Sequence, residues 1–282
     1  MRYLESSTAS AVAHYLQTGD HDADFRNWPG TNFFDSARNA DSTLREALIA
    51  AVRSREVKQD DRPSLQLGDV VSVTRSKVAP MVTGLFPLAE RPAIMAALET
   101  SVVFLTPDNI ETVLRSCSWL HTTWSLANMY LMSFGAEPLS SEARAIVGLS
   151  QETTCYLSVD YLDSQEQDPF ADYLVHEAAH VFHNCKRQTV GLPETRSREF
   201  LLTIDYAKRE TFAYACEAYS RILTLGNTTA KRLAVLEEHA KQSVPDSSVD
   251  QNEYLDILRD AVSARNGWKR ILARCAPEKR SH

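Results

Sequence analysis

One stretch of the chain combines a helical apolar pattern with closely spaced polar side chains. It reads Asp168-Pro169-Phe170-Ala171-Asp172-Tyr173-Leu174-Val175-His176-Glu177-Ala178-Ala179-His180-Val181-Phe182-His183-Asn184. Its apolar residues recur at helical spacing, and Asp168 followed by Pro169 is typical of an N-cap and a first helical residue. We therefore predict a helix over residues 168–184 with a broad apolar face against a core.

Two histidines of this helix can point at one metal ion. His176 and His180 are four residues apart and so lie on one helix face, one turn from each other. Glu177 is one step around the helix, beside such an ion rather than on it, where its carboxylate would act as a general base for water. Neutral imidazoles with a carboxylate and one open position are the catalytic pattern of zinc, so we expect Zn²⁺ as the cofactor.

The segment His176-Glu177-Ala178-Ala179-His180 on a capped helix resembles the zincin superfamily of zinc metallopeptidases. The resemblance covers residues 154–224. Metzincins continue this motif with Gly and then His, whereas His183 and Lys186 stand at those positions here, which excludes that branch.

Gluzincins instead take a third ligand from a Glu on a following helix. The segment 209–217 resembles their pattern, with Glu210 as the ligand, and the resemblance implies a zinc site of His176, His180 and Glu210. The helix faces leave a second carboxylate open, because Glu217 lies on the same face as Glu210. Glu217 also has an ordinary helix partner four residues on in Arg221. His183 and Asp205 also stay open as the third ligand, as does a site without a third protein ligand.

Tyr214 departs from the gluzincin pattern. Many gluzincins carry an Asp four residues after the ligand Glu, which orients a zinc-bound His, and Tyr214 occupies that position. Tyr214 can accept a hydrogen bond from the imidazole, stabilise an oxyanion as a catalytic residue, or be structural.

The rest of the chain predicts an α+β fold that is predominantly helical. The chain has only 9 Gly and long runs of helix formers. Residues 154–161 alternate as a strand, and the resemblance implies that this strand lines the substrate cleft beside the active-site helix. Alternation predicts a second strand at 70–73. Helices are also predicted over 40–55, 108–132, 200–224, 229–242 and 251–274.

A polar break at residues 58–64 is the best linker candidate. We predict an N-terminal helical segment over 1–66, which can belong to the same domain, and a zincin-like catalytic domain with C-terminal helices over 67–282.

Composition excludes several classes of protein. The net charge of -7, with 30 Lys and Arg against 37 Asp and Glu, disfavours nucleic acid and anionic membranes as partners. Five widely spaced cysteines form no disulfide framework or zinc ribbon, and the N-terminus lacks the pattern of a secretory signal. We therefore expect a cytoplasmic protein. Its oligomeric state is not set by the sequence.

These observations predict an intracellular zinc metallopeptidase whose partner is a protein or peptide substrate. Two further functions are compatible with the same residues. One is a non-catalytic zinc-binding regulatory or interaction protein on a zincin scaffold, and the second is a metal-dependent hydrolase of a non-peptide amide.

Overall fold

The computed structural model describes residues 2–55, 67–161, 168–195, 198–244 and 246–278. Within these ranges it contains eleven α-helices and one three-stranded sheet, which confirms the predicted α+β, predominantly helical class. The chain forms two compact units, Met1–Pro63 with Phe104–Val147 and Ser64–Val103 with Gly148–His282. The predicted linker at 58–64 and the boundary at 66 lie outside the described residues.

The first unit is a helical cluster. Its helices are α1 (Arg2–Thr18), α2 (Phe33–Arg53), α5 (Ile110–Ser116) and α6 (Leu120–Ser133). The predicted helix over 108–132 is therefore two helices. Two long-range hydrogen bonds tie α1 to α6, because the Tyr15 hydroxyl donates to the Leu120 carbonyl at 2.7 Å and Trp124 Nε1 donates to the Leu16 carbonyl at 2.9 Å.

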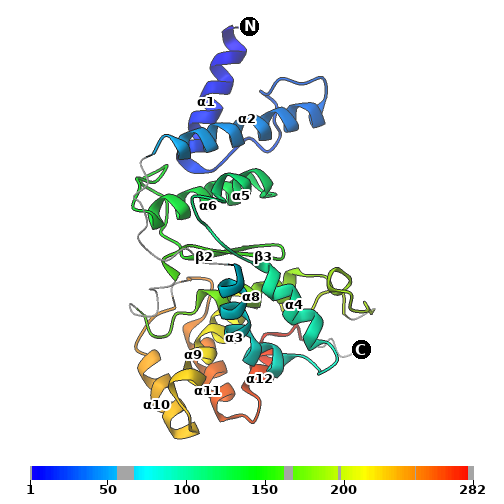
Figure 1. The fold of residues 1–282 in the computed structure, drawn as a ribbon, viewed down its shortest axis with the longest axis vertical. Coiled ribbons are helices and arrows are strands. Elements are labelled where there is room, and N and C mark those ends of the chain that lie inside the picture. The colour runs from blue at the N-terminus through cyan, green and yellow to red at the C-terminus, as the bar shows by residue number, and fades with distance from the viewer. Residues whose placement is uncertain (1, 56–66, 162–167, 196–197, 245, 279–282) are drawn as a thin grey trace. The chain divides into compact units, whose positions relative to one another are not determined.

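The second unit carries the sheet and the predicted active-site helix. Its elements are α3 (Leu67–Leu85), α4 (Arg91–Ser101), β2 (Gly148–Gln151), β3 (Thr154–Leu157), α8 (Tyr173–Asn184), α9 (Arg209–Leu225), α10 (Thr229–His239), α11 (Gln251–Ser263) and α12 (Gly267–Cys275). β1 (Val102–Phe104) completes the sheet at the boundary of this unit. Helix α8 packs against β2 and β3 and also against α9, so it lies between the sheet and the C-terminal helices (Figure 1).

The sheet has the order β1-β3-β2, so β3 is the central strand. β2 and β3 are antiparallel, with Gly148 opposite Leu157 and Gln151 opposite Thr154. The strand predicted at 154–161 is thus present over a shorter range, but both of its edges are paired and no edge remains for a peptide. Among the described residues β2 has only β3 as a strand neighbour, so β2 is an edge strand.

The strand predicted at 70–73 is wrong, since these residues belong to α3. Buried side chains recur along α3 at Val70, Thr74, Val78 and Met81, which is a helical period. Local alternation of valines misled the prediction because packing against α4 and α8 overrides β propensity.

Three predicted helix boundaries also move. Helix α8 begins at Tyr173, because Asp168 forms an Asx turn instead of an N-cap, with the Phe170 amide donating to Asp168 Oδ1 at 2.8 Å. Helix α9 begins at Arg209 after a short 3₁₀ turn over Tyr206–Lys208. The predicted helix 251–274 breaks into α11 and α12, where Asn266 caps α12.

Among the residues that the structure describes, no helix combines the length and the apolar content that a bilayer crossing requires.

Helix α3 approaches α12 closely at Gly84. A methyl group at this position would overlap the indole ring of Trp268, and the Gly84 carbonyl accepts a hydrogen bond from Asn266 Nδ2 at 2.9 Å. We expect Gly84→Ala to lower the free energy of unfolding by about 1–3 kcal/mol, because Trp268 must move. Urea denaturation measures this loss. Thr83→Ala, at the exposed neighbouring position, is the control, and equal losses in the two variants would contradict the close packing.

Candidate metal centre

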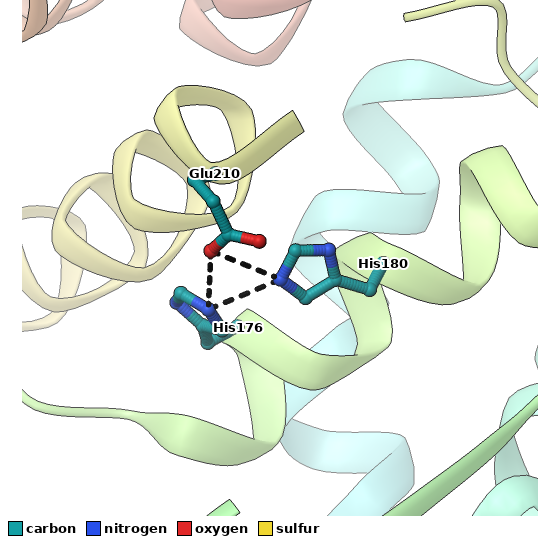
Figure 2. Close-up of side chains that lie close together, drawn as sticks. All are labelled: His176, His180 and Glu210. Atoms are coloured by element: carbon teal, nitrogen blue, oxygen red, sulfur yellow. Dashed lines mark hydrogen bonds and ion pairs between the residues drawn. The ribbon is translucent and has the colours of Figure 1, made fainter. Parts of the chain in front are cut away.

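Three side chains from two helices converge at the centre of the second unit. His176 and His180 lie one turn apart on α8, and Glu210 lies in the first turn of α9. The two histidine Nε2 atoms are 3.2 Å apart, and Glu210 Oε2 lies 3.7 Å from Nε2 of His176 and 3.5 Å from Nε2 of His180 (Figure 2). The structure therefore brings together the two predicted histidines and the first of the two predicted glutamates as a group that can hold a metal ion.

The spacing of these three atoms fits a metal ion. Zinc with nitrogen and oxygen ligands at about 2.0–2.1 Å in a tetrahedron separates its ligand atoms by about 3.3–3.4 Å. The three observed separations lie close to this value. The histidines are about nine-tenths buried, whereas 38% of the Glu210 side chain is exposed, so the group is accessible from the Glu210 side.

The electrostatic field at this group favours a cation. Burial acts to lower the pKa of His176, but the carboxylates of Glu210 and Glu217 outweigh it and raise that pKa to about 10. Burial acts to raise the pKa of Glu210, but the two histidines outweigh it and hold the pKa of this carboxylate well below its ordinary value. Without a metal the group thus binds a proton strongly, and a metal ion would displace that proton.

Glu217 lies on the other side of the His176 ring. Its Oε2 is 3.1 Å from His176 Nδ1, and its Oε1 accepts a hydrogen bond from the Asp172 amide at 2.7 Å. Because a carboxylate accepts, the Nδ1 atom of His176 donates and a neutral ring presents its lone pair at Nε2. Glu217 thus lies behind a candidate ligand, where a carboxylate can orient the ring. The partner expected for it, Arg221, donates instead to the Pro169 carbonyl at 2.7 Å.

Asp172 extends this buried polar network. It is 1% exposed, and its carboxylate accepts hydrogen bonds from Lys77 Nζ at 2.8 Å and from the Tyr161 hydroxyl at 2.9 Å. Lys77 lies on α3, 95 residues before Asp172 in the chain. Sequence reasoning missed Asp172, Lys77 and Tyr161, because no local spacing pattern links residues so far apart.

Glu177 points to the sheet rather than into the group of three. It is buried, the side chain of Ser150 in β2 acts to lower its pKa, and a methyl group at Gly148 would lie 3.0 Å from its Cγ. Burial raises the pKa of Glu177, although His176 and His180 act to lower it. Gly148 therefore lets the edge strand approach this carboxylate closely.

We call His176, His180 and Glu210 the metal group. Tyr214 contacts this group through its ring. Its ring centroid lies 4.5 Å from that of His176, in a T-shaped arrangement. The imidazole N–H that Tyr214 was expected to meet is directed at Glu217 instead. Burial raises the pKa of the Tyr214 hydroxyl, with the charges of Glu217 and Glu210 adding to the effect.

His183 and Asp205, the remaining ligand candidates, lie outside the group. His183 is buried and its Nε2 lies 3.0 Å from His180 Nδ1. Burial, together with the charges of His180 and Arg209, lowers the pKa of His183 to about 3. Asp205 accepts from the Ala207 amide at 2.9 Å and so caps the 3₁₀ turn before α9.

Comparison of the chain with protein-family models, with curated proteins and with solved structures gives no match. The zincin resemblance therefore rests on the motif and on the site geometry.

The ligand assignment predicts a ranking of zinc contents. Purified wild-type protein should hold about one zinc per chain, and His180→Ala and Glu210→Ala should hold little, because two ligands bind zinc weakly. Glu217→Gln keeps an acceptor for His176 Nδ1 and should retain most of its zinc. Mass spectrometry measures the metal, and Glu237→Ala, at an exposed glutamate, is the control. A greater loss from Glu217→Gln than from Glu210→Ala would make Glu217 the ligand.

Zinc uptake should release a proton. His176 has its pKa raised to about 10 when the metal is absent, and zinc binds the neutral ring. We expect about one proton released per zinc at pH 7 and an apparent affinity that rises roughly tenfold per pH unit below pH 10. Calorimetry in buffers of different ionisation enthalpy counts these protons. An affinity that is constant between pH 6 and pH 8 would contradict the raised pKa.

Proposed function

We propose that this protein is a zinc-dependent metallopeptidase of gluzincin type. The main support is that His176, His180 and Glu210 converge, while the buried carboxylate of Glu177 lies next to this group without belonging to it. A purely structural zinc site needs no such carboxylate, because its coordination is closed by protein ligands. This favours an enzyme over a non-catalytic zinc-binding protein.

The residues that would hold Zn²⁺ are His176, His180 and Glu210. Bound there, Zn²⁺ would supply Lewis acidity, which polarises a carbonyl group and makes water more acidic. The donor set of two imidazoles and one carboxylate is one that catalytic zinc sites use.

Glu177 is the proposed general base. Its carboxylate follows a ligand directly and belongs to a buried side chain whose pKa burial raises, so it is a stronger base than an exposed glutamate. It would take a proton from the attacking water and pass it to the leaving amine. The close approach of Gly148 would keep the carboxylate next to β2 during this transfer.

The substrate class we propose is a protein or peptide. β2 is an edge strand beside Glu177, and its four residues are partly exposed. An extended peptide can pair with the outer edge of such a strand, which would place its backbone near the metal group. β2 thus takes the role that the zincin resemblance implied for β3.

Tyr214 would serve this reaction by its ring contact with His176, which limits rotation of that ligand. A direct role for its hydroxyl in stabilising the oxyanion remains part of the proposal.

The decisive experiment separates metal binding from catalysis. Glu177→Gln should retain about one zinc per chain and lose at least about a thousandfold in kcat for peptide hydrolysis, because it removes the base but no ligand. Peptide-library cleavage and metal analysis of the same preparation give both readouts. Glu177→Gln that cleaves peptides at the wild-type rate would refute the mechanism.

Two results would favour a different function for the same site. Zinc-loaded protein that does not bind a hydroxamate would indicate a closed, non-catalytic site, because a hydroxamate needs an open coordination position. Hydrolysis of simple amides without cleavage of any peptide would indicate a non-peptide amidase.

A further inference from the structure

The two histidines of the metal group have different partners behind them. His176 Nδ1 faces the carboxylate of Glu217, whereas His180 Nδ1 faces another imidazole, that of His183, at 3.0 Å. His183 Nδ1 in turn lies 3.0 Å from Asn184 Oδ1. These contacts form a chain from His180 through His183 to Asn184.

The position of the ligand atom settles the direction of every hydrogen bond in this chain. His180 presents Nε2 to His176 and Glu210, so a metal-binding His180 has its lone pair at Nε2 and its proton at Nδ1. That proton is donated to His183 Nε2. The proton of His183 is then on Nδ1 and is donated to Asn184 Oδ1, which accepts. Donor and acceptor alternate without a conflict at any atom.

We propose that His183 is a positioning residue that holds His180 in the tautomer and ring orientation required for metal binding. The proposal deepens the proposed function and rests on it, because it concerns the same metal group. It concerns a residue that the sequence left open as a third ligand and that the geometry places behind His180.

The surroundings of His183 suit this role. The residue is 4% exposed, and its ring meets that of His180 edge to face, with centroids 5.2 Å apart. Both residues lie on α8 three positions apart, so the helix itself keeps the rings adjacent. A buried ring with few accessible rotamers can restrain its neighbour at little entropic cost.

The two ligands therefore differ in character. His176 donates to a charged carboxylate, which makes its ring the more basic ligand, whereas His180 donates to a neutral acceptor. Loss of the neutral partner leaves a buried N–H without an acceptor and frees the ring to turn.

Zinc affinity of paired variants tests the proposal. His183→Leu removes the acceptor, whereas His183→Gln places an amide oxygen near the position of the Nε2 atom. We expect the Leu variant to bind zinc about 10–100-fold more weakly and the Gln variant to stay within about threefold of wild type. His239→Leu is the control, because His239 is a partly buried histidine that bonds the Tyr254 hydroxyl at 2.6 Å. It should bind zinc as the wild type does.

Competition with a chromogenic chelator gives the affinities, and the visible bands of the Co²⁺-substituted proteins report the coordination geometry. These bands should change in His183→Leu and return in His183→Gln, which a loss of packing alone would not produce. Equal zinc affinity in His183→Leu and wild type, or an equal loss in the Leu and Gln variants, would overturn the proposal.

Two further outcomes are distinguishable. Wild-type protein that takes up no zinc refutes the proposed function and this inference with it, whereas normal uptake by wild type and His183→Leu alike refutes this inference alone. Should His183→Leu fail to fold, Asn184→Ala takes its place, with Asn184→Asp as the variant that keeps the acceptor. Equal zinc affinities for that second pair then overturn the proposal.

Discussion

The buried carboxylate of Glu217 connects the two helices that carry His176, His180 and Glu210. One oxygen faces His176 Nδ1 and the other accepts from the amide of Asp172, the residue that precedes α8. A single buried side chain of α9 thus contacts the His176 ring and satisfies a backbone group at the N-terminus of the helix that carries His176. Negative charge is favourable at that end of a helix, because the amide dipoles point toward it. This contact joins α8 to α9 beside the place where Glu210 meets the two histidines, within the extensive packing of these two helices.

Burying so many acidic groups requires compensating charge. Glu177, Glu217 and Asp172 are each at most 6% exposed, and Glu210 lies beside them. Lys77 forms an ion pair with Asp172. The carboxylates of Glu210 and Glu217 raise the pKa of His176 far above its ordinary value, so its imidazole stays protonated when no metal is bound. A divalent cation offsets the same field more fully than one proton does. The electrostatics of the unit and the geometry of the three ligand atoms therefore lead to the same conclusion.

The position of α8 links this charge distribution to the sheet. One side of the helix meets α9 and Glu210, while Glu177 meets the edge strand β2. Gly148 makes that second contact close, because a side chain there would push against Glu177. Helix α8 therefore contacts both the partly exposed Glu210 and the edge strand β2. β3, the shorter form of the strand predicted at 154–161, is the central strand of the sheet and packs against α8 as well.

Local sequence determined the parts of the site that a single helix fixes. The spacing of His176, Glu177 and His180 specifies two adjacent imidazoles and a neighbouring carboxylate, because 3.6 residues complete one turn. The helical class followed in the same way from apolar periodicity and scarce glycine. The choice between Glu210 and Glu217 did not follow, since residues seven apart share a helix face and lie about 10 Å apart along the axis. Only the packing of α9 on α8 assigns them, with Glu210 at the Nε2 side of the His176 ring and Glu217 at the Nδ1 side. The contact of Lys77 with Asp172, the helical state of residues 70–73 and the central place of β3 were likewise decided by tertiary structure. Each of these depends on partners distant in the chain, whose positions no local spacing rule specifies.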